Sequence, residues 1–265
     1  DHERVLDATS IAKLAELPRS LVVLGAGVVG SAYASVLAVL GVEVTLVDAF
    51  ERPLAFLDPD LTDGFERAFA ERGGVYLPTE TVAEVALEPS GVRVRLQSGR
   101  ELRAERVLSA LGRSPNVEDL GLERAGVDTR AGGFVRVDAA QRTSAPGVYA
   151  VGDVTGPPCL ASWAMEQGRR AARHALGLEA PLDVGATPAG VYTLPEMAMV
   201  GLAEREARAR HGGALVGLAR YGEIARGQLG GVSEGLLKLV TDPSGTRVLG
   251  VHIMGEGATE LIHVG

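Results

Sequence analysis

The glycine-rich segment from Gly25 to Gly30, with the pattern G-x-G-x-x-G, constrains the fold of this 265-residue chain more than any other feature. It follows an apolar run at 21–24 that is typical of a buried strand, and it precedes a helical run at 31–40 closed by Gly41. A second apolar strand is expected at 42–47. This order predicts a βαβ unit and therefore a parallel, Rossmann-like α/β sheet.

The spacing within this segment suits the phosphates of a dinucleotide. Gly25 would make the tight turn, Gly27 would let the backbone approach a pyrophosphate, and Gly30 would let the helix pack closely on the strand. Val28 and Val29 lie between the second and third glycines, just before the predicted helix, whose N-terminus would offer amide donors and a partial positive charge to an anion. The alternative is a purely structural glycine turn.

Asp48 supports the nucleotide interpretation. It ends the second predicted strand, 23 residues after Gly25, where its carboxylate can accept hydrogen bonds from a ribose diol. Its charge would repel a 2′-phosphate, and no arginine directly follows it, although Arg52 is near. The sequence therefore favours NAD(H) over NADP(H) at this site.

The rest of the chain alternates helical and strand-like runs. Helices are expected at 60–72, 161–176 and 203–211, and a short helix with a linker is expected in 1–20. Strands are expected at 75–77, 81–87, 92–97, 101–111, 148–151, 235–241 and 248–254. The runs between 81 and 111 predict an antiparallel meander inserted into the α/β unit. The Pro/Gly/Ala-rich tract 179–188 predicts a domain boundary.

Composition excludes several classes of function. The formal net charge of −8 argues against nucleic acid as the main partner, and no run reaches the roughly 20 apolar residues of a membrane helix. Cys159 is the single cysteine, which excludes an internal disulfide and a cysteine metal cluster and favours a reducing, cytoplasmic compartment.

Neither the histidines nor the cysteine predicts a reactive centre. The five histidines show no spacing that would hold a metal: His2, His174, His211, His252 and His263. Cys159 precedes a predicted helix start, which could lower the pKa of its thiol. The simpler interpretation is a small, half-buried residue. We therefore predict no metal site and no catalytic residue within this chain.

Three segments together carry a family resemblance. Gly25–Gly30, Ala110–Asn116 and Thr143–Asp153 resemble, in order and spacing, the pyridine nucleotide-disulfide oxidoreductases, which are flavoproteins. Within that family the chain is most similar to the soluble pyridine nucleotide transhydrogenases. The segments that carry this narrower likeness are Tyr33–Ser35, Leu54–Asp58, Leu160–Ser162, Gln167–Arg169 and Gly190–Glu196.

The resemblance implies three regions. Residues 1–115 would be the NAD(P)-binding domain, 116–186 the returning part of the FAD-binding domain, and 187–265 part of a C-terminal α+β dimerisation domain that forms a homodimer. It also implies that Gly112, Asp153, Leu160 and Ala161 contact cofactor. Both ends of the chain look cut, so we expect the flavin fingerprint and the usual active-site residues to lie outside it, and the isolated fragment to be inactive.

The implied activity is transfer of hydride between NAD(H) and NADP(H) through FAD. Lipoamide dehydrogenase or a related disulfide reductase is the enzymatic alternative, and a non-catalytic nicotinamide-binding sensor or interaction module is an alternative of another class. One position departs from the family, which usually has a glutamate two residues after the third glycine where this chain has Ala32. This departure predicts a divergent flavin environment.

Overall fold

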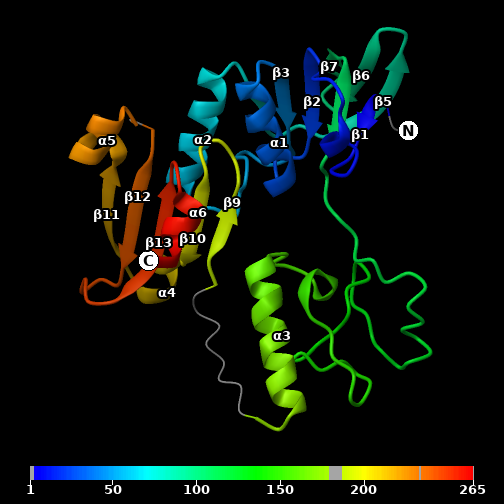
Figure 1. The fold of residues 1–265 in the computed structure, drawn as a ribbon, viewed down its shortest axis with the longest axis vertical. Helices are drawn as coiled ribbons and strands as arrows, with labels where there is room; N and C mark the ends of the chain where they lie inside the picture. The colour runs from blue at the N-terminus through cyan, green and yellow to red at the C-terminus, as the bar shows by residue number, and fades with distance from the viewer. Residues whose placement is uncertain (1–2, 179–186, 233, 265) are drawn as a thin grey trace. The chain divides into compact units, whose positions relative to one another are not determined.

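The structure, a computed structural model, describes residues 3–178, 187–232 and 234–264. It divides into two compact units (Figure 1). Unit 1 comprises Asp1–Gly112 with Gly190–Gly265, and unit 2 comprises Arg113–Ala189. Most of the predicted boundary at 179–188 lies outside the described residues. The division into three domains remains a prediction.

A five-stranded parallel sheet forms the first part of unit 1. Its strands follow the order β1-β8-β2-β3-β4, and each pairs in parallel with its neighbours. The strands are β1 (Val5–Leu6), β2 (Ser20–Leu24), β3 (Glu43–Val47), β4 (Val75–Leu77) and β8 (Arg106–Ser109). The predicted Rossmann-like parallel sheet is thus confirmed.

Two helices of unit 1 have capping residues, one after its C-terminal end and the other at its N-terminal end. Helix α1 (Val28–Val39) is followed by Gly41 at φ +88°, a conformation that favours glycine. Helix α2 (Pro59–Glu71) has Asp58 as its N-cap, whose carboxylate accepts a hydrogen bond from the amide of Asp60 at 3.1 Å. The helix predicted at 31–40 in fact begins three residues earlier, directly after Gly27.

Alternate residues of β2 bury their side chains on opposite faces of the sheet. Leu21 and Val23 join the core that α1 and α2 cover, whereas Val22 and Leu24 join a second core beneath the meander. Parallel sheets are usually covered on both faces, as this one is. The glycine turn therefore follows a strand that is buried from Leu21 to Leu24.

The meander is antiparallel, in the order β5-β6-β7, as predicted. Its strands are β5 (Val82–Glu88), β6 (Gly91–Leu96) and β7 (Glu101–Ala104). The single strand predicted at 101–111 is wrong, because the chain leaves the meander at Ala104 and enters the parallel sheet as β8. The amide of Glu105, at this corner, donates to Ser20 Oγ at 3.0 Å.

The C-terminal part of unit 1 is a second sheet, in the order β11-β12-β13-β10-β9. Its strands are β9 (Ala189–Val191), β10 (Met197–Gly201), β11 (Leu215–Arg220), β12 (Leu236–Thr241) and β13 (Val248–Met254). Short helices accompany it: α4 (Glu204–His211), α5 (Ala225–Gly230) and α6 (Ala258–Leu261). Met197, Leu236 and Met254 belong to the same core as α1 and α2, so this sheet packs directly against the α/β layer.

An ion cluster around a buried lysine joins the two parts of unit 1. Lys238 on β12 is 2% exposed, and its Nζ lies 2.8 Å from Asp58, 2.6 Å from Asp60 and 2.8 Å from Glu204. Burial alone would raise the pKa of Asp58, but hydrogen bonds from Lys238 and from backbone amides hold it below its ordinary value. The same lysine lowers the pKa of Glu204. We refer to these four residues as the Lys238 cluster.

Unit 2 contains one long helix and extended loops. Helix α3 (Ala161–Ala175) packs against a 3-10 turn, η2 (Gly152–Thr155). The strand predicted at 148–151 is wrong: this segment makes only the isolated bridge Arg142–Tyr149, with no neighbouring ladder among the described residues to extend it.

Two further expectations concern the first residues and the membrane. The predicted short helix in 1–20 is reduced to a 3-10 turn at Ile11–Lys13, and β1, which pairs with β8, was not expected. Within the described ranges, no helix is both long and apolar enough to cross a membrane.

Candidate functional site

The glycine turn lies at the carboxyl end of β2, the edge at which open α/β sheets bind ligands. Gly25 has φ +98°, and a Cβ there would lie 2.5 Å from the carbonyl oxygen of Ala110. A Cβ at Gly30 would overlap the carbonyl oxygen of Gly25. Both glycines are therefore required by the packing of the chain itself.

Gly27 is different. Its φ of −74° is open to any residue, and a Cβ there would meet no atom within 4 Å. It is the N-cap of α1, a position where Ser, Thr, Asp or Asn would satisfy an amide that glycine leaves without a side-chain partner. The packing within the chain thus gives no reason for a glycine here, and open space faces the start of the helix.

The first turn of α1 is arranged to receive an anion. It has no side-chain cap and no acidic residue, so its first amides keep their capacity to donate and the positive end of the helix dipole is not neutralised. Ser31 stabilises the turn, because its Oγ donates a hydrogen bond to the carbonyl oxygen of Ala26 at 3.0 Å.

Asp48 reaches the glycine turn from the end of β3. One carboxylate oxygen accepts a hydrogen bond from the amide of Ala26, and the other accepts from the amide of Phe50 at 2.9 Å. The side chain is half-buried. A carboxylate can accept about four hydrogen bonds, so capacity remains for ribose hydroxyls. Asp48 therefore holds the turn in place and also places a negative charge beside it. The sequence pattern predicted only the second of these roles.

The loop that follows Asp48 folds back over the turn. The amide of Leu54 donates to the carbonyl of Ala26 at 2.8 Å, and the Tyr76 hydroxyl donates to the carbonyl of Phe50 at 2.9 Å. Burial, followed by the charge of Asp48, raises the pKa of Tyr76, which keeps the phenol neutral. The strand β4 and this loop therefore form a wall beside the turn.

Gly112 also belongs to this edge of the sheet. Ala110 follows β8, and its amide donates to the carbonyl of Leu24 at 2.8 Å, next to Gly25. Gly112 lies two residues further on, at φ +130°. The structure thus brings Gly25, Gly27, Val28, Val29, Gly30 and Asp48 together, with Gly112 on the segment beside them.

The predicted residues of unit 2 form a separate group. Asp153 is exposed within η2, and Leu160 and Ala161 open α3, which has no side-chain cap and no acidic residue in its first turn. The buried Gln167 links the two elements: its Oε1 accepts from the amide of Gly152 at 2.7 Å and its Nε2 donates to Thr155 Oγ1 at 3.3 Å. No sequence pattern indicated that Gln167, a buried polar side chain, stabilises the η2 turn.

Cys159 is exposed, and the pKa of its thiol is raised by desolvation and by the neighbouring Asp153 carboxylate. The possibility that the helix start activates it is therefore not supported. Among the described residues, no group of three histidine, cysteine or acidic side chains could hold a metal ion. His252 is fully buried in the second sheet, where burial lowers its pKa.

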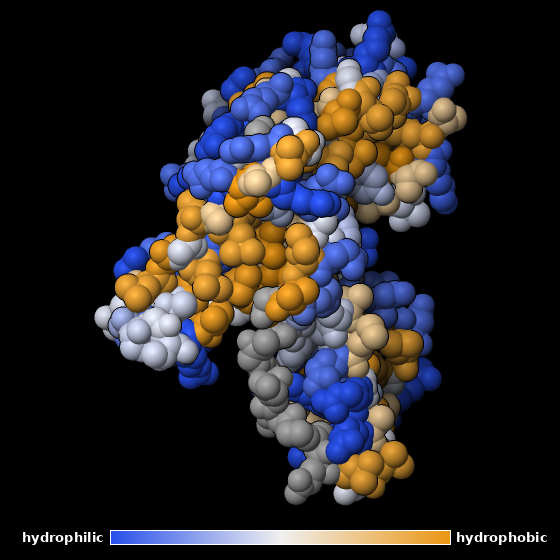
Figure 2. Space-filling model, turned by 60° about the vertical axis from the view of Figure 1, so that its left-hand side comes forward, coloured by the Kyte–Doolittle hydropathy of each residue, from blue (hydrophilic) through white to orange (hydrophobic). Residues whose placement is uncertain are grey.

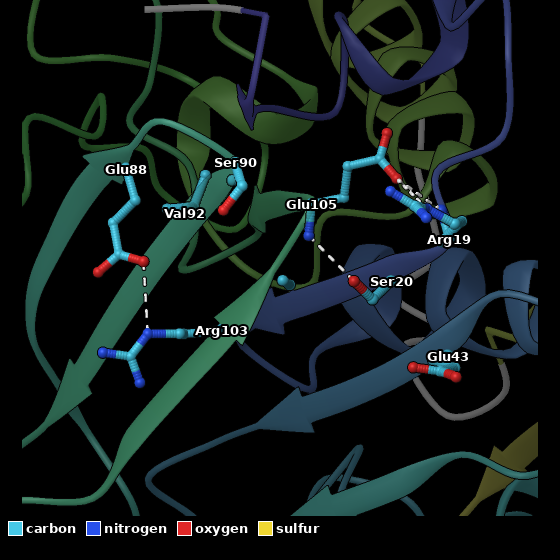
Figure 3. A pocket seen from close by; sticks show the side chains of 10 residues that line it. Arg19, Ser20, Glu43, Glu88, Ser90, Val92, Arg103 and Glu105 are labelled. Carbon is cyan, nitrogen blue, oxygen red and sulfur yellow. Dashed lines mark hydrogen bonds and ion pairs between the residues drawn. The ribbon is translucent and has the colours of Figure 1, made fainter.

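A pocket of about 370 Å³ lies at the opposite, amino edge of the sheet (Figure 3). Ser20 and Glu43, the first residues of β2 and β3, line it together with residues of the meander. Four of its five charged side chains form ion pairs, since Arg19 lies 3.6 Å from Glu105 and Arg103 lies 3.3 Å from Glu88, and the fifth, Glu43, is exposed. The position and these ion pairs favour the glycine turn over this pocket as the ligand site.

These features define a Rossmann-like α/β protein whose parallel sheet is followed by a separate antiparallel sheet. The family model described as pyridine nucleotide-disulphide oxidoreductase matches residues 1–168, and the dimerisation domain of the same family matches residues 187–265. The chain therefore belongs to the pyridine nucleotide-disulphide oxidoreductase family. The resemblance given by the sequence motifs is thus confirmed.

Curated relatives carry a more specific name. The chain is 40% identical over all its 265 residues to the soluble pyridine nucleotide transhydrogenase of Mycobacterium tuberculosis, and 39% identical to that of Chromohalobacter salexigens. It spans 57% of the length of each.

Solved structures agree on the fold. LpdA of Mycobacterium tuberculosis superposes with a TM-score of 0.93 at 35% identity, covering all of this chain and 58% of that protein. The HOCl-induced flavoprotein disulfide reductase RclA of Escherichia coli has a TM-score of 0.92 at 27% identity, and 61% of it is covered. Similarity thus extends to proteins named both as transhydrogenase and as disulfide reductase.

Proposed function

We propose that the turn from Gly25 to Gly30 binds a nicotinamide dinucleotide, and that the whole protein passes hydride between NAD(H) and NADP(H) through FAD. The observation that supports the binding site most strongly is Gly27, a glycine that neither backbone strain nor packing explains. A pyrophosphate at the uncapped start of α1 would explain it, because a side chain at Gly27 would stand between the helix amides and the phosphates.

Asp48 would then orient the adenosine ribose and select against a 2′-phosphate. Its carboxylate is already fixed by two backbone amides, so it cannot swing away from an approaching phosphate without releasing the turn. Like charges brought together in a partly desolvated site cost on the order of 1–3 kcal/mol. NADH should therefore bind here more tightly than NADPH.

The family binds FAD, and unit 2 has features that fit part of it. Asp153 is exposed, and the start of α3 is uncapped and free of acidic residues, so together they could hold a hydroxyl-bearing chain and a phosphate. Gln167 would keep the Asp153 turn against the helix. When bound, the flavin accepts and releases the hydride, while the protein positions the nucleotides.

The experiment is a pair of measurements. Calorimetric titration of this chain with NADH tests the binding site, and absence of binding would contradict it. Hydride transfer from NADH to an NADP⁺ analogue by the full-length protein tests the activity. Nucleotide binding with reduction of a disulfide substrate but without this transfer would favour the second candidate, a lipoamide dehydrogenase-like or other disulfide reductase, to which the likeness to RclA points. Binding without any electron transfer would favour a sensor.

We further propose that the whole protein forms a homodimer through the second sheet. Leu215, Val216 and Leu218 on the edge strand β11 are all exposed, and Leu229 on α5 is 90% exposed. A cavity of about 1080 Å³ lies between these elements and α6. Figure 2 shows apolar side chains gathered in broad patches on this side of unit 1. Such patches usually mark an interface.

A cytoplasmic location remains a prediction that rests on the single cysteine.

A further inference from the structure

Arg52 occupies the loop that closes over the glycine turn. Two residues before it, the amide of Phe50 is bound by the Asp48 carboxylate, and two residues after it, the amide of Leu54 is bound by the carbonyl of Ala26. Consecutive Cα atoms are about 3.8 Å apart, so an arginine between these two anchors has its backbone beside the nucleotide site.

The Arg52 guanidinium is directed elsewhere. It forms an ion pair with the carboxylate of Asp63 on α2. The side chains are 40% and 50% exposed, respectively. The pair therefore lies at the surface, where such pairs contribute little to stability, so that removing Asp63 would release the guanidinium without disturbing the fold. Arginine binds phosphate readily because its planar fork donates two parallel hydrogen bonds.

From this geometry we infer that Asp63 is a specificity-determining residue: by pairing with Arg52 it withholds a guanidinium that would otherwise bind the 2′-phosphate of NADP(H). The inference rests on the proposed nucleotide site at the Gly25–Gly30 turn. It adds a second element to the choice of nucleotide. Asp48 repels the 2′-phosphate directly, whereas Asp63 keeps the Arg52 guanidinium, the cation that would pair with that phosphate, away from it.

The test is calorimetric titration of four proteins with NADH and with NADPH at low ionic strength: the native chain, Asp63→Asn, Arg52→Gln and the double variant. Because the pair is exposed, its loss should strengthen NADPH binding only about threefold to fivefold in Asp63→Asn, with NADH affinity unchanged. The double variant should lose this gain. Arg52→Gln alone should bind NADPH as the native chain does, since its guanidinium is already engaged.

Glu51→Gln is the matched control. It removes a negative charge from the adjacent exposed position without releasing Arg52. If Asp63→Asn gains no more NADPH affinity than Glu51→Gln, or if the gain survives in the double variant, general charge explains the effect and the inference is wrong. If the native chain binds neither nucleotide, the proposed site itself fails, which is a distinguishable result.

Discussion

The glycine turn and the Lys238 cluster are two polar regions of the same unit with opposite character. In the cluster, the buried Lys238 ammonium pairs with three carboxylates, and the chain supplies all of these partners. At the turn, an uncapped helix start faces open space beside a glycine that the chain does not need. A polar region whose groups find their partners within the chain indicates a structural role, whereas one with unused hydrogen-bond donors indicates a ligand site.

The largest expected effect tests the architectural side of this comparison. Lys238→Met leaves the buried Asp58 carboxylate without its cation, and breaking a buried pair in this way costs about 3–5 kcal/mol of unfolding free energy. Chemical denaturation measures it. Lys13→Met changes the other lysine of the chain, which is exposed, and is the matched control. It should change the free energy of unfolding little. A small loss for Lys238→Met would mean that the cluster contributes no net stability.

Gly30→Ala should be the next most damaging change. Its methyl group would overlap the carbonyl oxygen of Gly25, so the helix must move away from the strand at a cost of about 1–3 kcal/mol. The thermal midpoint should fall clearly, and NADH binding should fall with it because the turn itself is displaced. An unchanged melt would show that the close approach of α1 to β2 is not essential.

Gly27→Val should separate binding from folding. Its side chain enters open space in the unliganded protein, so the thermal midpoint should move by only a few degrees. NADH affinity should fall at least about tenfold, or roughly 1.4 kcal/mol. Calorimetry and a thermal melt on the same preparation check both. Retained affinity in a folded variant would place the dinucleotide elsewhere.

A smaller effect is expected for Asp48→Asn. Asparagine keeps an oxygen that can accept from a backbone amide but removes the charge, so it is a cleaner change than alanine at a residue that holds Ala26 and Phe50. The preference for NADH over NADPH should narrow by about 1 kcal/mol, or roughly fivefold. Equal affinities for the two nucleotides in the native chain would contradict the role of Asp48.

The smallest effect is the acid dependence of the cluster. Because the pKa values of Asp58 and Glu204 are lowered on folding, the stability they contribute is complete above about pH 5 and is lost as the pH falls through their folded values. Denaturation at several pH values should show this decline in the native chain and a weaker one in Lys238→Met. Parallel declines would assign the acid sensitivity to other carboxylates.

Much of the fold could be predicted from local pattern. The strands β2, β3 and β4, the helices α1, α2 and α3, and the meander carry clear periodicity and glycine punctuation. The division of 101–111 between two sheets could not be predicted, because only Glu105 separates β7 from β8 and the pairing that distinguishes β8 is with the distant strand β2. β10 and β11, which pair with β13 and β12 far along the chain, were missed for the same reason, and the three-residue edge strand β9 was missed as well.

The candidate site was predicted as a set of residues but not as a set of roles. The spacing identified three glycines, yet only neighbouring atoms show that Gly25 and Gly30 are structural while Gly27 is open. Asp58, Asp60 and Glu204 meet Lys238 across up to 180 residues of chain, which no local pattern could indicate.

The burial of Lys238 has a practical consequence for chemical labelling. Lys13 and Lys238 are the only two lysines of the chain, one exposed and the other enclosed by carboxylates that keep its amine protonated. An amine-reactive reagent should therefore modify Lys13 in the folded protein and spare Lys238, because only a neutral, accessible amine reacts. Labelling of Lys238 would report unfolding, or separation of the second sheet from α2, with no probe added to the sequence.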